Sequence, residues 1–186
     1  ELVGISLAVE PEVGYYIPVG HNQAQTQLPI DEVVRALKPS LENIHIGKTG
    51  HNMKYDALVL SGYGIDIQPY TFDTMIAGWL INPASFHLGL KDMALQYLGL
   101  EMQHIEALIG SGKSQISMAQ VSVESTAPYA AADAAVPLSL MPLLKEKLTK
   151  NNATNVFEEI EMPLIPILAQ MERNGIILDK DFFKQM

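Results

Sequence analysis

The chain has 186 residues, 48% of them hydrophobic, and a formal net charge of −9. This length allows one ordinary domain plus part of another, and the apolar content suffices for a packed core. The acidic balance argues against a free-standing nucleic-acid-binding protein, because such proteins usually present basic patches, but it is compatible with carboxylates gathered around cations. The absence of cysteine excludes disulfides and thiolate metal sites and agrees with a reducing compartment.

Neither a membrane span nor a signal peptide is expected. The sequence has no uninterrupted apolar run of about 18 residues. Its first residues, Glu1-Leu2-Val3-Gly4, lack an initiating Met and a basic segment, so we expect a segment of a longer protein without a secretory leader.

The first part of the chain predicts a hairpin, a helix and a strand. Leu2–Val9 alternates in hydrophobicity and Tyr15–Val19 is apolar, with turn residues between them, which is typical of a β-hairpin. A helix start is predicted at Pro29-Ile30-Asp31, with Asp31 as the N-cap. Ile44–Gly47 is predicted as a short strand that leads into a helix over Asn52–Leu60.

Helices follow in the middle of the chain. One is predicted from Phe72 to about Ile81, where Asn82-Pro83 stops it, and another over Leu90–Leu98, closed by Gly99. The glycine-rich stretch Gly110–Ser114 is predicted as a polar loop, because the phosphate-binding motif needs a glycine at position 107, which is Ala.

Ser125–Lys150 is rich in Ala, Leu and Lys and is predicted as one long helix. A polar break separates it from a helix over Val156–Arg173, and Asp179 is expected to cap a last helix. Strands followed by helices, with one more strand between them, indicate a mixed α/β domain.

Two pairs of polar residues repeat the same helical spacing. Tyr129 and Asp133 stand at i and i+4 with three alanines between them, so they share one uncovered face. Such a carboxylate suits a hard cation, and the phenol can orient an attacking water, as in metal-assisted hydrolysis. Asn52 and Asp56 stand at i and i+4 at the start of another predicted helix.

Three of these residues also have an ordinary structural explanation. Asp133 suits a cap or a salt bridge, Tyr129 a core position with a satisfied hydroxyl, and Asn52 an N-cap. Asp73 precedes Thr74 at a predicted helix start, so capping explains it fully and we leave it outside the site. The histidines share no metal-ligand spacing, so no zinc site is expected.

The order Asn52-x-x-x-Asp56 then Tyr129-x-x-x-Asp133 resembles the second and third motifs of the DEDDy 3′–5′ exonucleases. Over essentially the whole chain, and in order, the sequence resembles bacterial family A DNA polymerases. The segments that carry this likeness are Gly50–Asp56 (Gly-His-Asn-Met-Lys-Tyr-Asp), Phe72–Met75, His87–Ala94 and Asn155–Leu164.

The resemblance implies an α/β fold with a ribonuclease H-like mixed sheet flanked by helices. It implies that Asp133 ligates the metal that activates water and that Tyr129 orients this water. It further implies that Asp56 holds a second metal and that the Asn52 amide braces the site. The implied cofactor is a pair of Mg²⁺ (or Mn²⁺) ions, and the implied reaction is proofreading, which releases deoxynucleoside monophosphates from DNA 3′ ends.

The same resemblance implies partners, location and domain organisation. The partners are the single-stranded 3′ end of DNA and the remainder of the polymerase chain, in the bacterial cytoplasm, without a membrane and without an oligomer. Residues 1–150 would form the 3′–5′ exonuclease domain. Residues 151–186 would begin the polymerase domain with the first helix of that second domain.

One departure from the family concerns its first motif, Asp-x-Glu on a strand, which would lie upstream of Glu1. We therefore expect an N-terminally truncated domain that is inactive alone, with an open or otherwise filled slot between Leu2–Val9 and Ile44–Gly47. A vestigial, non-catalytic scaffold domain of the same polymerase is the alternative. A relative of the ribonuclease D type is disfavoured by the Asn155–Leu164 segment, which matches the polymerases beyond the nuclease.

Overall fold

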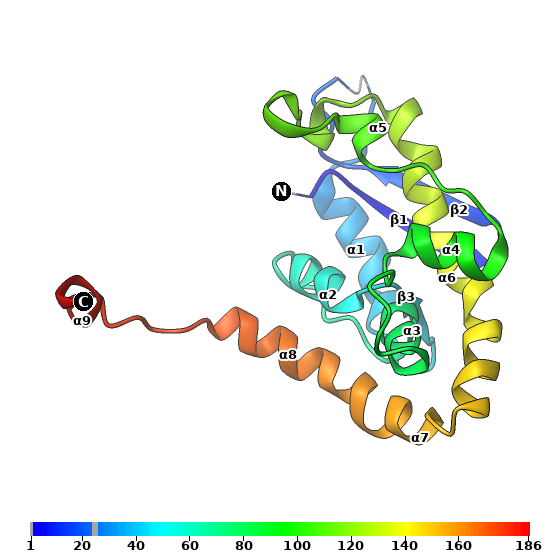
Figure 1. Cartoon of the computed structure of the whole chain (residues 1–186). Coiled ribbons are helices and arrows are strands. Elements are labelled where there is room, and N and C mark those ends of the chain that lie inside the picture. Colours follow the sequence, from blue (N-terminus) through cyan, green and yellow to red (C-terminus); the bar gives the residue numbers. More distant parts are fainter. Residues whose placement is uncertain (1, 24–25) are drawn as a thin grey trace.

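The structure is a computed structural model that describes residues 2–23 and 26–186 (Figure 1). Short strands surrounded by helices make a mixed α/β arrangement, as predicted. The elements are β1 (Gly4–Glu10), β2 (Val13–Pro18), α1 (Ile30–Leu41), β3 (Lys48–Gly50), α2 (Met53–Ser61), β4 (Tyr70–Asp73), α3 (Thr74–Ile81), α4 (Leu90–Leu98), α5 (Glu106–Ile109), η1 (Gly112–Ser114), η2 (Met118–Gln120), α6 (Val123–Lys150), α7 (Thr154–Val156), η3 (Phe157–Glu161), α8 (Met162–Asn174) and α9 (Lys180–Gln185).

The predicted hairpin is confirmed. Strands β1 and β2 pair antiparallel, with Ile5 opposite Ile17 and Leu7 opposite Tyr15. Ile5 and the α1 residue Val33 are buried in one hydrophobic cluster, which fixes α1 close to the hairpin. The N-cap of α1 is Pro29, so the prediction for Asp31 is wrong. Asp31 lies in the first helical turn, where a negative charge is favoured by the helix dipole.

The second strand pair is parallel and differs from the prediction. The strand predicted at Ile44–Gly47 is wrong, because β3 begins at Lys48 and pairs with β4. Ile44 and Ile46 are 64% and 47% exposed, so their side chains face solvent and the apolar run is not a buried strand. The ladder partner decides the strand position here, because β4 pairs with Lys48, Thr49 and Gly50.

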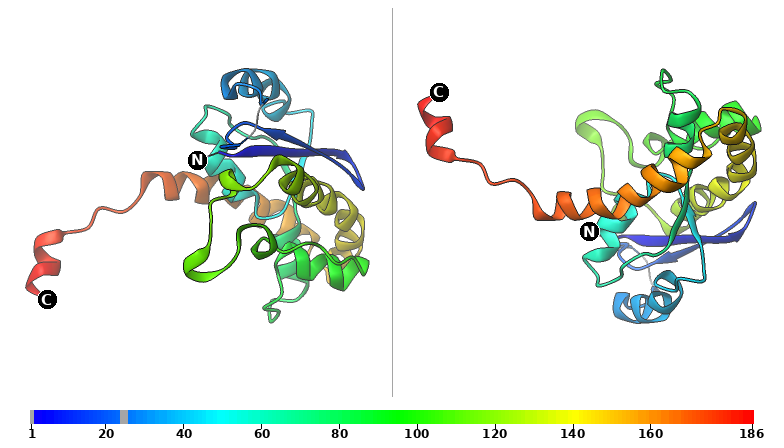
Figure 2. Two further views of the ribbon diagram at one scale, coloured as in Figure 1. Left: turned by 90° about the horizontal axis from the view of Figure 1, so that it is seen from above. Right: turned by 90° about the horizontal axis from the view of Figure 1, so that it is seen from below.

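The two strand pairs are not joined to one another by a hydrogen-bonded ladder within the described residues. Helix α6 contacts β1, β2 and β3, and so lies against strands of both pairs. In both views of Figure 2 the β1–β2 hairpin (dark blue) forms a layer apart from the helices α3 and α4 (green). Packing against α6 therefore connects the two strand pairs, which no backbone ladder of the described residues joins.

The long predicted helix is confirmed as α6 and is a core helix. By length and composition it is apolar enough to cross a membrane. Instead, it packs against strands and against α3 and α4. Leu140, Leu144 and Leu148 are at most 1% exposed and follow one another at i and i+4, which makes one buried stripe. Phe72 and Phe157 join this cluster, with ring centroids 4.8 Å apart.

The helical segment predicted over Val156–Arg173 is present as α7, η3 and α8 in succession. It ends at Gly175, whose φ of 68° suits glycine. Asp179 accepts hydrogen bonds from the backbone N–H groups of Asp181 and Phe182, which confirms the predicted cap of α9. In Figure 1 the chain leaves α8 as an extended strand-like segment and places α9 (red) away from the rest of the molecule.

Candidate active site

Tyr129 and Asp133 both lie on α6, one turn apart and partly buried. The small residues between them serve packing as well as access. A Cβ added to Gly14 on β2 would lie 2.1 Å from the Ala131 carbonyl oxygen, so the hairpin backbone rests directly on this turn of α6. The local sequence thus positions Tyr129 and Asp133 by clamping their helix against the hairpin.

A lysine from another helix lies against both side chains. The Lys91 ammonium, in the first turn of α4, forms an ion pair with the Asp133 carboxylate. The same ammonium is 3.4 Å from the Tyr129 hydroxyl oxygen and 4.4 Å from the centroid of its ring. This cation–π contact and ion pair make a three-residue polar cluster between α4 and α6.

The environment keeps the phenol of Tyr129 protonated. Burial raises the pKa of Tyr129, and the neighbouring Asp133 carboxylate raises this pKa further, because both disfavour a phenolate. A neutral phenol can donate a hydrogen bond to a water or to an oxyanion over the whole physiological pH range.

Asn52 and Asp56 lie at the start of α2. Asn52 occupies the N-cap position in the left-handed conformation, with φ 59° and ψ 47°, but its side chain makes no capping hydrogen bond. Asp73 supplies that cap. Its carboxylate is 1% exposed and accepts hydrogen bonds from the backbone N–H groups of Asn52 and Met53 at α2 and of Met75 and Ile76 at α3. The capping role predicted for Asp73 is therefore confirmed, and it extends to two helices.

The Asp56 carboxylate has an unusual acidity. Its side chain is open to solvent on one side, yet desolvation by the surrounding protein raises its pKa to about 6, and the nearby Asp73 carboxylate raises this pKa as well. A cation beside Asp56 would favour its charged form, because a positive charge offsets both effects.

His51 directly precedes Asn52 and contacts the start of α3. Its Nδ1 is 2.9 Å from the Thr74 hydroxyl, and burial lowers the pKa of His51. The carboxylates of Asp73 and Asp133 act on this pKa in the opposite sense, and the ammonium of Lys91 lowers it. The Asp133 carboxylate on α6 therefore affects the pKa of His51, which directly precedes Asn52, the N-cap of α2.

The predicted site residues include the type of ligand that Mg²⁺ prefers, but they are too few to complete its coordination. Asp56 and Asp133 offer the hard oxygen ligands that this ion prefers. No hydrogen bond or ion pair in the described part of the chain joins Asn52 or Asp56 to Tyr129 or Asp133 directly. Across residues 2–23 and 26–186, no three His, Asp or Glu side chains gather closely enough to hold a metal. By themselves, these residues offer fewer ligands than a Mg²⁺ ion takes.

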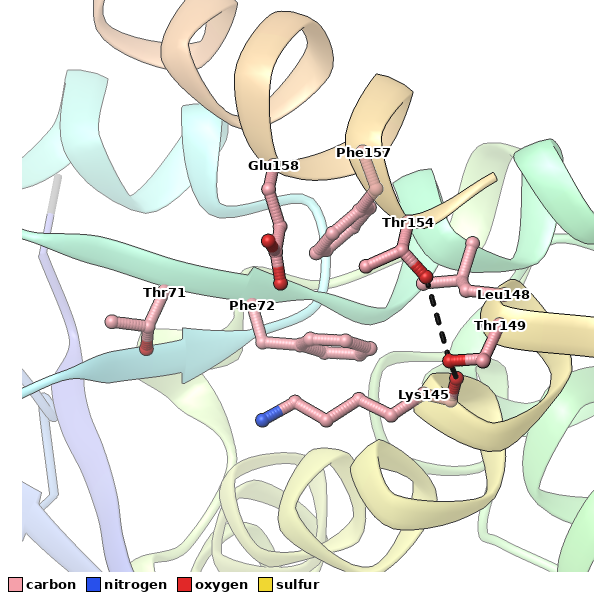
Figure 3. A pocket seen from close by; sticks show the side chains of 8 residues that line it. All are labelled: Thr71, Phe72, Lys145, Leu148, Thr149, Thr154, Phe157 and Glu158. Atoms are coloured by element: carbon pink, nitrogen blue, oxygen red, sulfur yellow. Dashed lines mark hydrogen bonds between the residues drawn. The ribbon is translucent and has the colours of Figure 1, made fainter. Parts of the chain in front are cut away.

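A pocket of about 220 Å³ lies elsewhere, among α6, β4 and η3. Figure 3 shows the Phe72 ring in the middle of the lining residues, with the Lys145 side chain running along one side of it and Glu158 pointing toward Phe72 from the other. The Lys145 ammonium is 5.6 Å from the centroid of the Phe72 ring. None of the predicted site residues lines this pocket, so it is separate from the candidate site.

Sequence reasoning missed two residues of this region. Lys91 lies within His87–Ala94, one of the segments that resemble the polymerases. Its position in the first turn of a predicted helix was the available signal, because the helix dipole disfavours a cation there and a nearby anion has to compensate. His51 is also outside the set of residues predicted for the site. The structure shows it largely surrounded by protein and bonded to Thr74.

Solved structures define the class of the fold. The chain superposes on Brucella melitensis NrnC with a TM-score of 0.71 at 20% identity, covering 94% of this chain and 78% of NrnC. A structure of NrnC with bound Mg²⁺ gives a TM-score of 0.62 at 19% identity, covering 92% and 83%. The POL domain of Pol1 from M. smegmatis, in complex with DNA primer-template and dNTP, gives 0.70 at 25% identity, covering 92% of this chain and 25% of that one. The arrangement is therefore the ribonuclease H-like nuclease fold predicted from the sequence.

The family model described as 3′-5′ exonuclease matches residues 1–149, and the chain belongs to this exonuclease family. DNA polymerase I of Chloroflexus aurantiacus is 44% identical over 189 residues, which cover 100% of this chain and 20% of the relative. DNA polymerase I of Pseudomonas aeruginosa is 36% identical over 184 residues, covering 96% and 20%. The predicted resemblance to family A DNA polymerases is confirmed, and the chain spans about a fifth of the length of these relatives.

Proposed function

We propose that this chain is the proofreading part of a DNA polymerase I, which removes deoxynucleoside monophosphates from the single-stranded 3′ end of DNA. The observation that carries the proposal is the family match over residues 1–149 together with Asn52, Asp56, Tyr129 and Asp133 at the motif positions. We further propose that residues 1–150 are the exonuclease domain, that residues 151–186 begin the polymerase domain, and that the protein works in the bacterial cytoplasm.

In this proposal each residue has one role. Asp133 and Asp56 would hold Mg²⁺ or Mn²⁺, which when bound supplies a positive charge at the scissile phosphate and a more acidic water. The neutral Tyr129 phenol orients the attacking water by a hydrogen bond. Asn52 braces the start of α2 beside Asp56. Further acidic ligands, such as the family's Asp-x-Glu pair, have to complete the site, because the described residues provide too few.

A scaffold without catalytic activity is the second candidate, and one observation favours it. Asp133 is neutralised by Lys91 instead of standing free for a cation. Four residues at the motif positions favour the enzyme, since a scaffold gains nothing by keeping Asn52, Asp56, Tyr129 and Asp133 together in one sequence.

A nuclease assay on single-stranded DNA with Mg²⁺ decides between these functions. We expect no degradation by the chain alone, and activity when the chain is extended by the polymerase segment that carries Asp-x-Glu. In the extended chain, Asp133→Ala should abolish activity. The matched control Glu146→Ala removes an exposed, lysine-paired carboxylate from the same helix and should leave activity unchanged. An inactive extended chain would favour the scaffold.

A further inference from the structure

The polar cluster of Lys91, Tyr129 and Asp133 places a cation where the proposed function needs a metal. Lys91 pairs with the carboxylate oxygen Oδ1 of Asp133, and its ammonium also lies near the Tyr129 hydroxyl and over its ring. The side chains of Lys91 and Asp133 are 18% and 29% exposed. The lysines of other ion pairs in the described residues are more exposed, such as Lys38 at 47% and Lys150 at 69%.

The fold holds Lys91 at this place for reasons independent of the charge itself. Helix α4 is anchored by its buried residues Leu90, Met93 and Ala94 and packs on α6. Lys91 follows Leu90 in the first turn of this anchored helix and contacts α6 through Asp133 and Tyr129. A lysine in the first turn of a helix is opposed by the helix dipole. The Asp133 carboxylate and the face of the Tyr129 ring compensate for that unfavourable position.

We propose that Lys91 is a built-in counter-ion of Asp133 that a divalent cation has to displace before it can bind there. This inference rests on the proposed function, in which Asp133 is a metal ligand. An ammonium and a divalent cation compete for the same carboxylate oxygen, and they repel each other at close range. The ion pair therefore stabilises the metal-free domain and weakens its affinity for metal. The long, flexible lysine side chain can withdraw while α4 stays in place.

Because the described residues alone provide too few ligands, the competition is tested on the extended chain that carries Asp-x-Glu. This chain is titrated with Mn²⁺, and the electron paramagnetic resonance signal of the free ion is followed. Lys91→Met should bind Mn²⁺ roughly 5- to 30-fold more tightly than the wild type, the effect of removing a partly shielded competing charge. Lys91→Arg keeps the charge and should bind as weakly as the wild type. Lys38→Met removes an ion-paired lysine away from the cluster and serves as the matched control.

A metal-free measurement tests the ion pair itself. In EDTA, the free energies of unfolding of Lys91→Met, Asp133→Asn and the double variant are measured in urea. The double variant should lose less free energy of unfolding than the two single variants lose together, which shows that the two residues are coupled. Additive effects, or Mn²⁺ binding by Lys91→Met no tighter than by the wild type, overturn the inference. The proposed function fails separately, if Asp133→Asn leaves the Mn²⁺ binding of Lys91→Met intact or if the extended Asp133→Ala chain still degrades DNA.

Discussion

The Asp73 carboxylate accepts a hydrogen bond of 2.7 Å from the backbone N–H of Met53, in the first turn of α2, while it also caps α3. One buried anion therefore fixes the starts of two helices that are separated in sequence. Each helix N-terminus presents unpaired N–H groups and a partial positive charge, and both favour a carboxylate at this position.

Replacing Asp73 by Ala should destabilise the protein by about 3 kcal/mol or more, because two caps are lost and buried N–H groups are left without an acceptor. Urea unfolding measures this loss. Asp179→Ala is the matched control, since Asp179 caps the exposed helix α9 and its loss should change stability by less than about 0.5 kcal/mol. Equal effects of the two substitutions would contradict the role of Asp73.

Removal of residues 151–186 should destabilise the remaining chain by more than about 3 kcal/mol, the cost of losing a buried aromatic side chain. Phe157, Met162 and Ile165 are 2%, 6% and 3% exposed and belong to the cluster that contains Phe72. Ending the chain at Asn174 is the control and should leave the urea midpoint unchanged, since residues 175–186 are exposed. A stable chain of residues 1–150 would show that the C-terminal helices add nothing to this core.

The stability of the protein should fall as the pH rises through the titration of Asp56. Because its pKa is raised to about 6 in the folded chain, the folded state binds this proton more tightly than the unfolded state. The stabilisation is therefore present below pH about 4 and is lost between about 4 and 6. With allowance for its open side, Asp56→Asn should raise Tm at pH 7.5 by roughly 2–4 °C and leave Tm at pH 4 unchanged.

Differential scanning calorimetry at both pH values makes this comparison. Asp66→Asn removes an exposed carboxylate and controls for the loss of one charge from an acidic protein. A gain in Tm that is the same at pH 4 and pH 7.5 would point to net charge instead of the acidity of Asp56.

Gly14→Ala should cost about 1–3 kcal/mol or more, because its Cβ would overlap the Ala131 backbone on α6. The same change should displace the turn that carries Tyr129 and Asp133, so the extended chain should lose nuclease activity as well. Gly89→Ala meets its nearest neighbour, Asp92, at 3.8 Å and should be much milder. Thermal melting of both variants would expose an error if Gly14→Ala proved as mild as Gly89→Ala.

Local signals predicted the helices well, and non-local contacts explain the failures. Helix α4 matches its prediction because Gly99 adopts the left-handed conformation that ends a helix. The strand predicted at Ile44–Gly47 was wrong because its place depends on pairing with β4, whose last residues, Phe72 and Asp73, the sequence pattern placed at the start of a helix. Lys91 escaped notice for the same reason, since its partner Asp133 is 42 residues away.

The link that α6 makes between the two strand pairs determines how the domain unfolds. In a continuous sheet, neighbouring strands share main-chain hydrogen bonds, so loss of one strand directly weakens the next. Here no ladder crosses from β1 to β3 in the described residues, and cooperation between the halves has to pass through side chains packed on α6. We therefore expect the two strand pairs to open as separate units, with the slowest amide exchange in α6, which contacts both.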